Sequence, residues 1–344
     1  MMRNLPRLAG TVQRNCDISD ARYAGDYGLC TFLLKMREYY RWENELPFSH
    51  VLPGSELGEW LQLRERQWTA IEAEAFQPLP LERGEFDPFA AAAVNRELVP
   101  QGLVYGAGYG RFRKPVFYLG SLLRVEQRAG VTIVVSSCEY ARELAAPPAM
   151  LQDRTIFVRR ESVRRYLWEK IEEWQWRKQG KAMARALAGY DFPAGPDAAL
   201  ERMAANEMET MILHEIGEAK AGELLGDEWR ELTASAAQPR SEGIARAVRD
   251  LLADSLSTLP VLLERGNLPA LHFHFATFDA PRRQMFPQAL EAYEHFLRCG
   301  EVDRLWQVAR EGKERWLECA RALLALSPAA REAAMESLQP PSAR

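Results

Sequence analysis

Three side chains of metal-ligand type recur at helical spacing in one stretch of the sequence. At about 100° per residue, Glu207, His214 and Glu218 fall within about 40° of one another around a helix axis. The apolar residues on the same face are Leu200, Met203, Met211 and Leu225. Burying carboxylates and an imidazole is costly unless they are paired, protonated or bound to a metal. This face therefore predicts a metal site.

The element that must position these groups is a long helix, which we expect over residues 198–225 with an interruption near Gly226. Its charged residues cluster on the opposite side and indicate a solvent-exposed face. Glu215 lies about 100° from His214 and so falls off the face of the ligands. We expect Glu215 to act as a general base or to support the ligands through hydrogen bonds.

A second source of ligands is the pair His272 and His274, which lies in an apolar run at residues 268–275. In an extended conformation both rings would point to the same side of the chain. Together with the helix they would supply four or five nitrogen and oxygen ligands, a set that suits iron, manganese or zinc. The carboxylates favour iron or manganese redox chemistry over zinc-dependent hydrolysis.

A structural interpretation of the same residues remains open. The Glu–His–Glu face could be a buried polar network, paired with Arg37 or Arg41, that only fixes helix register. His272 and His274 could likewise be satisfied core or interface histidines. The protein would then be a non-enzymatic helical interaction protein. Ligands that converge on an open position would favour a metal, whereas closed pairing to arginine would favour the structural network.

Three further residues of ligand type are not assigned to the site. Asp250 and Asp254 share a helix face, but this face is opposite the apolar residues of their segment. His295 lies outside the apolar stripe of its own predicted helix. We therefore place none of the three in the predicted metal site.

The ligand helix partly resembles two known kinds of metal-binding helix. The run His214-Glu215-Ile216-Gly217-Glu218 is similar to the H-E-x-x-H helix of zinc peptidases, with Glu218 in place of the second histidine. That resemblance implies a zinc-bound His214 and Glu215 as general base. The spacing from Glu207 to His214 resembles the first ligand helix of haem-oxygenase-like di-iron proteins, which need further ligands on later helices.

Two runs resemble an uncharacterised bacterial family of helical proteins. They are Leu33-Leu34-Lys35-Met36-Arg37-Glu38-Tyr39-Tyr40-Arg41-Trp42-Glu43 and Leu213-His214-Glu215-Ile216-Gly217-Glu218-Ala219. The resemblance covers most of the chain and implies no assigned activity.

The pattern as a whole predicts a mainly α, bundle-like protein with a small antiparallel β-hairpin insertion. We expect an N-terminal helical region at 1–100, with residues 1–22 irregular, and the insertion at 101–160. A C-terminal helical region at 161–330 holds the metal site, and 331–344 form a flexible tail. A glycine-rich, basic segment at 106–114 could cradle an anion, but we interpret it as a flexible approach to the hairpin.

Composition limits the classes of function. The 344 residues carry a net charge of −4, which gives no general attraction to nucleic acid, so we expect no nucleic-acid partner. No apolar run is long enough to span a membrane. Five scattered cysteines without a C-x-x-C pair predict reduced thiols and a cytoplasmic location. The expected substrate is an unidentified small molecule, and a homo-oligomeric state stays open.

Overall fold

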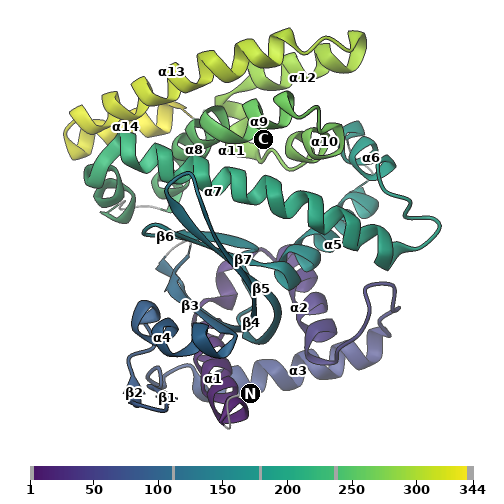
Figure 1. The fold of residues 1–344 in the computed structure, drawn as a ribbon, viewed down its shortest axis with the longest axis vertical. Coiled ribbons are helices and arrows are strands. Elements are labelled where there is room, and N and C mark those ends of the chain that lie inside the picture. The colour runs from purple at the N-terminus through teal and green to yellow at the C-terminus, as the bar shows by residue number, and fades with distance from the viewer. Residues whose placement is uncertain (1–3, 111–112, 178–179, 236–238, 339–344) are drawn as a thin grey trace. The chain divides into compact units, whose positions relative to one another are not determined.

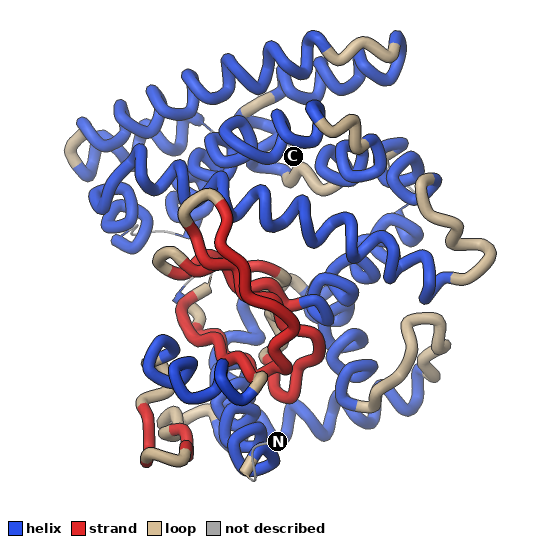
Figure 2. The backbone as a smooth tube through the Cα atoms, viewed as in Figure 1, coloured by secondary structure: helices blue, strands red, loops and turns tan. Residues whose placement is uncertain are grey.

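A computed structural model describes residues 4–110, 113–177, 180–235 and 239–338 of the chain (Figure 1). The described residues are mostly helical, which confirms the predicted class (Figure 2). They divide into two compact units. Unit 1 comprises residues 1–176 and 192–204, and unit 2 comprises residues 177–191 and 205–344. No described helix combines the length and the apolar character that crossing a membrane requires.

Unit 1 contains a five-stranded sheet, so its β part is larger than the predicted hairpin. The strands are β3 (Leu103–Tyr109), β4 (Pro115–Arg128), β5 (Val131–Arg142), β6 (Ala149–Gln152) and β7 (Thr155–Arg159). They are arranged in the order β3-β4-β5-β7-β6, and neighbours are antiparallel except for the parallel pair β5–β7. A separate two-stranded sheet pairs β1 (Leu79–Leu81) with β2 (Gly84–Phe86).

The hairpin β4–β5 was predicted from the sequence. Ala129 and Gly130 connect the strands with φ values of 50° and 79°, and Arg128 pairs with Val131. Positive φ at both positions of a two-residue loop matches the right-handed twist of the flanking strands. Residues 106–109 of the glycine-rich segment belong to strand β3, contrary to the predicted flexible approach. A Cβ at Gly106 would clash with the ring of Tyr118, so this glycine makes room for a side chain of β4. Residues 111–112 lie outside the described part of the chain.

The N-terminal segment was predicted to be irregular, and this prediction is wrong. Helix α1 (Leu5–Tyr23) buries Leu8, Val12 and Cys16 completely and packs against β4 and β5. Its polar residues Asn15 and Asp20 are buried too, which interrupts the apolar stripe in the sequence. The other helices of unit 1 are η1 (Ala24–Asp26), α2 (Leu29–Glu43), α3 (Gly54–Ile71), α4 (Ala91–Leu98), η2 (Val99–Gln101) and α5 (Arg160–Arg177).

Unit 1 also buries an ionic network between β5, β7 and α5. Glu139 accepts hydrogen bonds from Arg159 Nη2 at 2.6 Å and from Ser162 Oγ at 2.6 Å. Arg159 also donates to Glu143 at 3.0 Å. Burial alone would raise the pKa of Glu139, but Arg159 and Arg142 lower it to about 2. The Glu139 carboxylate therefore stays charged and joins strand β5 to the end of β7 and the start of α5.

Unit 2 is helical and has its own core around Trp316, Leu305 and Phe286. Its helices are α6 (Lys181–Ala188), most of α7 (Pro196–Ser235), α8 (Pro239–Ala253), α9 (Leu259–Glu264), α10 (Leu268–Ala276), α11 (Ala280–Met285), α12 (Pro287–Cys299), α13 (Asp303–Ala325) and α14 (Pro328–Leu338). Helix α14 covers part of the predicted flexible tail and packs against α8 and α13, with Met335 buried.

Two irregularities in unit 2 involve the helices that matter most for the site. Gly226 has φ 73° and interrupts α7, as the sequence predicted. Between α8 and α9 the chain makes a π-helical segment, Asp254–Thr258, which lies just before Pro260. Proline cannot donate the backbone hydrogen bond of a regular α-helix. Single π-helical turns are frequent at functional sites.

The buried carboxylate of Glu139 makes a testable contribution to stability. Glu139→Gln should lower the unfolding free energy at neutral pH by about 3–5 kcal/mol, because it leaves buried arginine charge uncompensated. The difference in unfolding free energy between variant and wild type should shrink as the pH falls from about 4.5 to 2, because a carboxyl with a lowered pKa stabilises the fold only while it is ionised. Urea unfolding of the full-length protein measures both effects. The control Glu126→Gln, on the partly exposed strand β4, should change stability by less than about 0.5 kcal/mol. An equal change in the two variants would contradict this account.

Candidate metal centre

Two helices of unit 2 each contribute a pair of ligand-type residues, four positions apart. His214 and Glu218 lie on α7, and Asp250 and Asp254 lie at the end of α8 and the start of the π-helical segment. Residues four apart share a helix face, so each pair presents two side chains to the other helix. One nitrogen or oxygen atom from each of His214, Glu218 and Asp250 lies within 4.8 Å of the other two. This cluster is the candidate metal centre.

The imidazole of His214 is held between two carboxylates. Its Nδ1 atom lies 2.8 Å from Asp254 Oδ1, and its Nε2 atom lies 3.4 Å from Glu218 Oε1. The His214 side chain is 24% exposed, so the cluster is accessible to solvent on one side. Burial would lower the pKa of His214, but Asp254 and Glu218 raise it well above its usual value. Asp254 therefore fixes the ring orientation and leaves Nε2 directed at Glu218.

Two arginines neutralise part of this negative charge. Arg249 Nη2 donates to Glu218 Oε1 at 2.7 Å and to Asp250 Oδ1 at 3.1 Å. Arg282, on α11, donates to Asp254 Oδ2 at 3.2 Å and to Asp279 Oδ1 at 3.1 Å. Neither Arg249 nor Arg282 is one of the two arginines that the structural interpretation named. Within unit 1, Arg37 pairs with Glu172, and Arg41 with Glu38.

A glycine between His214 and Glu218 brings the two helices together. A Cβ on Gly217 would lie 2.8 Å from the carbonyl carbon of Ala253, closer than real Cβ contacts occur. Because Gly217 has no Cβ, the backbone of Ala253 can pass directly over α7. Asp254 is the next residue, so this close approach places its carboxylate against His214.

Glu215 lies at the edge of the cluster, where the sequence predicted a base. Its side chain is buried, and burial together with the charge of Glu218 raises its pKa. Burial would also raise the pKa of Glu218, but Arg249 and His214 lower it. Two neighbouring carboxyl groups thus differ in the pH at which they hold a proton. A carboxyl group that holds its proton towards neutral pH suits general acid–base chemistry.

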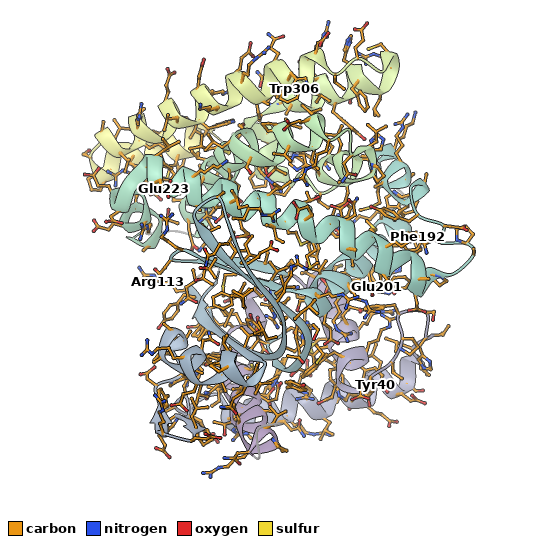
Figure 3. All side chains as sticks on the ribbon, viewed as in Figure 1. Tyr40, Arg113, Phe192, Glu201, Glu223 and Trp306 are labelled. Atoms are coloured by element: carbon orange, nitrogen blue, oxygen red, sulfur yellow. The ribbon has the colours of Figure 1, made fainter. Side chains whose placement is uncertain are left out.

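Glu207 is separate from the cluster, although the sequence grouped it with His214 and Glu218. It lies two helical turns from His214 and is 1% exposed, and its Oε1 atom has no hydrogen-bond partner. Removal from water raises its pKa to about 8. The seven-residue spacing correctly predicted that Glu207 and His214 share a helix face. The carboxylates contributed by α8 and the π-helical segment, however, contact only the C-terminal part of that face. Glu223, by contrast, lies on the exposed face of α7 that the sequence predicted (Figure 3).

The structure corrects the prediction that the two histidines of the H-x-H pair lie in an extended segment. His272 and His274 lie on helix α10, where residues two apart point in nearly opposite directions. His272 Nδ1 lies 2.8 Å from the Tyr293 hydroxyl, and the ring of His274 packs against Phe275 and Phe278. His274 is close enough to Asp254 for each to influence the pKa of the other. Neither histidine supplies a donor atom to the three-residue cluster.

Sequence reasoning missed Asp250 and Asp254, although their spacing was a usable signal. Their face of α8 is opposite its apolar residues, and we assumed that a site must share the apolar face of its helix. Asp250 and Asp254 instead lie beside the apolar core, where α8 meets α7 through Gly217. A search for two carboxylates four residues apart, together with a helix that carries a His–Glu pair and an internal glycine, would have identified the site.

The close contact at Gly217 can be tested with a second glycine of the same helix. Gly217→Ala should destabilise the protein by about 1–3 kcal/mol, because the new methyl group forces α8 away from α7. Gly222→Ala should stabilise it by about 0.5–1 kcal/mol, since a Cβ there meets nothing within 4 Å. Thermal unfolding of both variants measures the difference. Shifts of the same sign would show that Gly217 does not set the helix separation.

The buried carboxyl of Glu207 should make stability depend on pH. A carboxyl whose pKa is raised to about 8 on folding binds a proton in the folded state, so wild-type stability should fall as the pH rises from about 4.5 to 8. Glu207→Gln should flatten this slope by up to about 1.4 kcal/mol per pH unit. Glu223→Gln, on the exposed face of the same helix, should leave it unchanged. Chemical denaturation across this pH range gives the slopes, and parallel profiles for wild type and Glu207→Gln would refute the shift.

Comparisons with known proteins agree with the resemblance to an uncharacterised family. Residues 7–159 match the N-terminal domain model of DUF6866, and residues 164–342 match its C-terminal domain model. No curated protein and no solved structure gave a match. The chain therefore belongs to the DUF6866 family, a family of unknown function.

Proposed function

We propose that this protein binds a divalent metal ion between α7 and α8, with His214, Glu218 and Asp250 as ligands. The observation that carries the proposal is the convergence of one imidazole nitrogen and two carboxylate groups within 4.8 Å. This ligand set differs from the one that the sequence predicted: it keeps His214 and Glu218 and takes Asp250 in place of Glu207, His272 and His274.

The spacing of the donor atoms supports a metal. Ligands about 2.0–2.2 Å from a metal lie about 3.0–3.5 Å apart in octahedral or tetrahedral geometry. His214 Nε2 and Glu218 Oε1 are 3.4 Å apart, which falls in this range. Three protein ligands leave further coordination positions for water or a substrate.

The contacts of His214 outside the ligand set support the same proposal. Metal-binding histidines usually donate their second ring N–H to a carboxylate, which fixes the tautomer. Asp254 makes this contact with Nδ1, and Arg282 in turn holds Asp254. In this proposal Asp254 is a positioning residue, and Nε2 is the metal-binding atom.

The number of carboxyl groups also supports a bound cation. Glu215, Glu218, Asp250 and Asp254 bring four carboxyl groups to the cluster, against the guanidinium groups of Arg249 and Arg282 and the imidazole of His214, whose raised pKa favours its charged form. Burial is the main cause of the raised pKa values of Glu215 and Asp250, and the neighbouring carboxylate of Glu218 raises them further. A divalent ion would offset the repulsion and favour the ionised forms.

Arg249 supports a second candidate, in which the cluster is a closed structural network. Its guanidinium already contacts Glu218 and Asp250, so it would have to release these oxygens when a metal binds. If Arg249 is the permanent counter-charge, the cluster joins α7 to α8 without a metal. This is the non-enzymatic alternative, and it makes opposite predictions for an Arg249 variant.

For the metal-dependent function, we propose iron or manganese as the resident ion, with zinc as the alternative. Two carboxylates and one imidazole form an oxygen-rich set that suits harder ions than zinc thiolate sites do. Such an ion would supply redox chemistry on a small-molecule substrate, and Glu215 would serve as the acid–base group beside it. The five cysteines all lie in the described part of the chain and none is disulfide-bonded, which supports our proposal of a reducing, cytoplasmic location.

Metal content tests the proposal directly. Protein purified without a metal-affinity tag, or reconstituted anaerobically with Fe(II) or Mn(II), should hold close to one iron or manganese ion per chain by elemental analysis. His214→Ala should abolish the binding of this ion, and Asp254→Asn should weaken it by about 10–100-fold. His272→Gln, which changes a histidine outside the cluster, should bind as the wild type does.

Arg249→Gln separates the two candidates. If Arg249 competes with a metal, this variant should bind the ion more tightly than wild type, and the ion should restore its stability. If the network is structural, Arg249→Gln should be destabilised, and added metal should not rescue it. Metal-free wild-type protein after reconstitution, together with an Arg249→Gln variant that metal does not rescue, would reject the metal proposal.

A further inference from the structure

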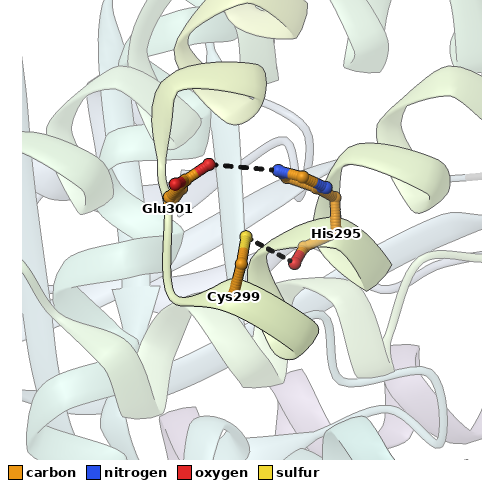
Figure 4. Close-up of side chains that lie close together, drawn as sticks. All are labelled: His295, Cys299 and Glu301. Atoms are coloured by element: carbon orange, nitrogen blue, oxygen red, sulfur yellow. Dashed lines mark hydrogen bonds and ion pairs between the residues drawn. The ribbon is translucent and has the colours of Figure 1, made fainter.

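A second group of metal-ligand atoms lies at the C-terminal end of α12, in residues that the proposed centre does not use. His295, Cys299 and Glu301 each offer one donor atom within 4.8 Å of the other two (Figure 4). His295 Nε2 lies 3.4 Å from Glu301 Oε2. Cys299 and Glu301 are exposed, and His295 is half-buried, so a hydrated ion can reach the group.

The end of the helix brings these three side chains together. His295 and Cys299 are four residues apart and share a face of α12, and the Cys299 thiol donates to the His295 carbonyl oxygen at 3.2 Å. Gly300 then adopts φ 78° and donates its N–H to the Phe296 carbonyl oxygen at 2.8 Å. This left-handed residue reverses the chain and returns Glu301 to the imidazole of His295.

We propose that His295, Cys299 and Glu301 form a second metal site, selective for zinc or a similar thiolate-binding ion. Nitrogen, sulfur and oxygen donors from these residue types are the usual zinc ligands, and water would complete a tetrahedron. Zinc ligands about 2.0–2.1 Å from the ion lie about 3.3 Å apart, close to the separation of the His295 and Glu301 atoms. Binding forms a zinc–sulfur bond and releases the thiol proton to solvent.

The thiolate distinguishes this site from the one between α7 and α8. Sulfur ligands favour zinc over manganese, whereas the carboxylates of Glu218 and Asp250 favour the harder ion. The two sites share no residue, and the second does not depend on the proposed function. An ion pair between His295 and Glu301 explains their contact without a metal, but it gives the exposed Cys299 no role.

Cobalt(II) is a suitable probe, because it takes the place of zinc and its bond to a thiolate gives an intense near-ultraviolet absorption band. Full-length, reduced wild-type protein titrated with Co(II) should develop this band, and Zn(II) should remove it. Cys299→Ser should lose the band and bind zinc more weakly by about tenfold or more, since even the loss of an outer partner costs that much. Because Cys299 is exposed, this substitution should not disturb folding.

Two control variants make the result specific. Cys138→Ser removes another exposed cysteine and should keep the band. His214→Ala should also keep it, which separates this site from the proposed centre between α7 and α8. A band that persists in Cys299→Ser, a band lost in Cys138→Ser, or wild-type protein with no band and no Zn(II) binding would each overturn the proposal.

Discussion

The close approach of α8 to α7 at Gly217 is the constraint on which the candidate centre depends. It is a backbone contact, because Ala253 occupies the space that a side chain at position 217 would fill. Packed helix backbones are rigid, so the residues that flank the contact are held at fixed positions. His214 and Glu218 flank Gly217 on one helix, and Asp254 follows Ala253 on the other. The chemistry of the site is thus set by the absence of one Cβ atom.

Both units bury carboxylates, but they balance the charge differently. In unit 1, Glu139 is fully paired with Arg159 and Ser162 and lies away from solvent, which is the pattern of a structural network. In unit 2, the cluster around His214 has more carboxyl groups than guanidinium groups and is open to solvent on one side. A solvent-accessible cluster of carboxyl groups can accept a cation at lower cost than a closed network whose carboxylate is already fully paired. This contrast is the physical basis for proposing the metal site in unit 2.

The accuracy of the sequence-based predictions followed the strength of local patterns. The hairpin β4–β5 and the interruption of α7 at Gly226 were predicted because turn residues and periodicity specify them locally. Helix α1 was missed because it buries polar residues such as Asn15, whose side chain hydrogen-bonds the backbone of Gln77. The pair His272 and His274 was assigned an extended conformation because a short apolar run does not distinguish a strand from a buried helix.

The sequence by itself determined that His214 and Glu218 share one face of a long helix, since four-residue spacing and helical geometry suffice for that. It also determined the mainly helical class. Only the tertiary structure decided which residues complete the cluster. Asp250 and Asp254 are more than thirty residues away in the chain, and their distance from His214 depends on how α8 crosses α7. That crossing is fixed by steric contact at Gly217, a property of two packed backbones that no periodic pattern in one segment encodes.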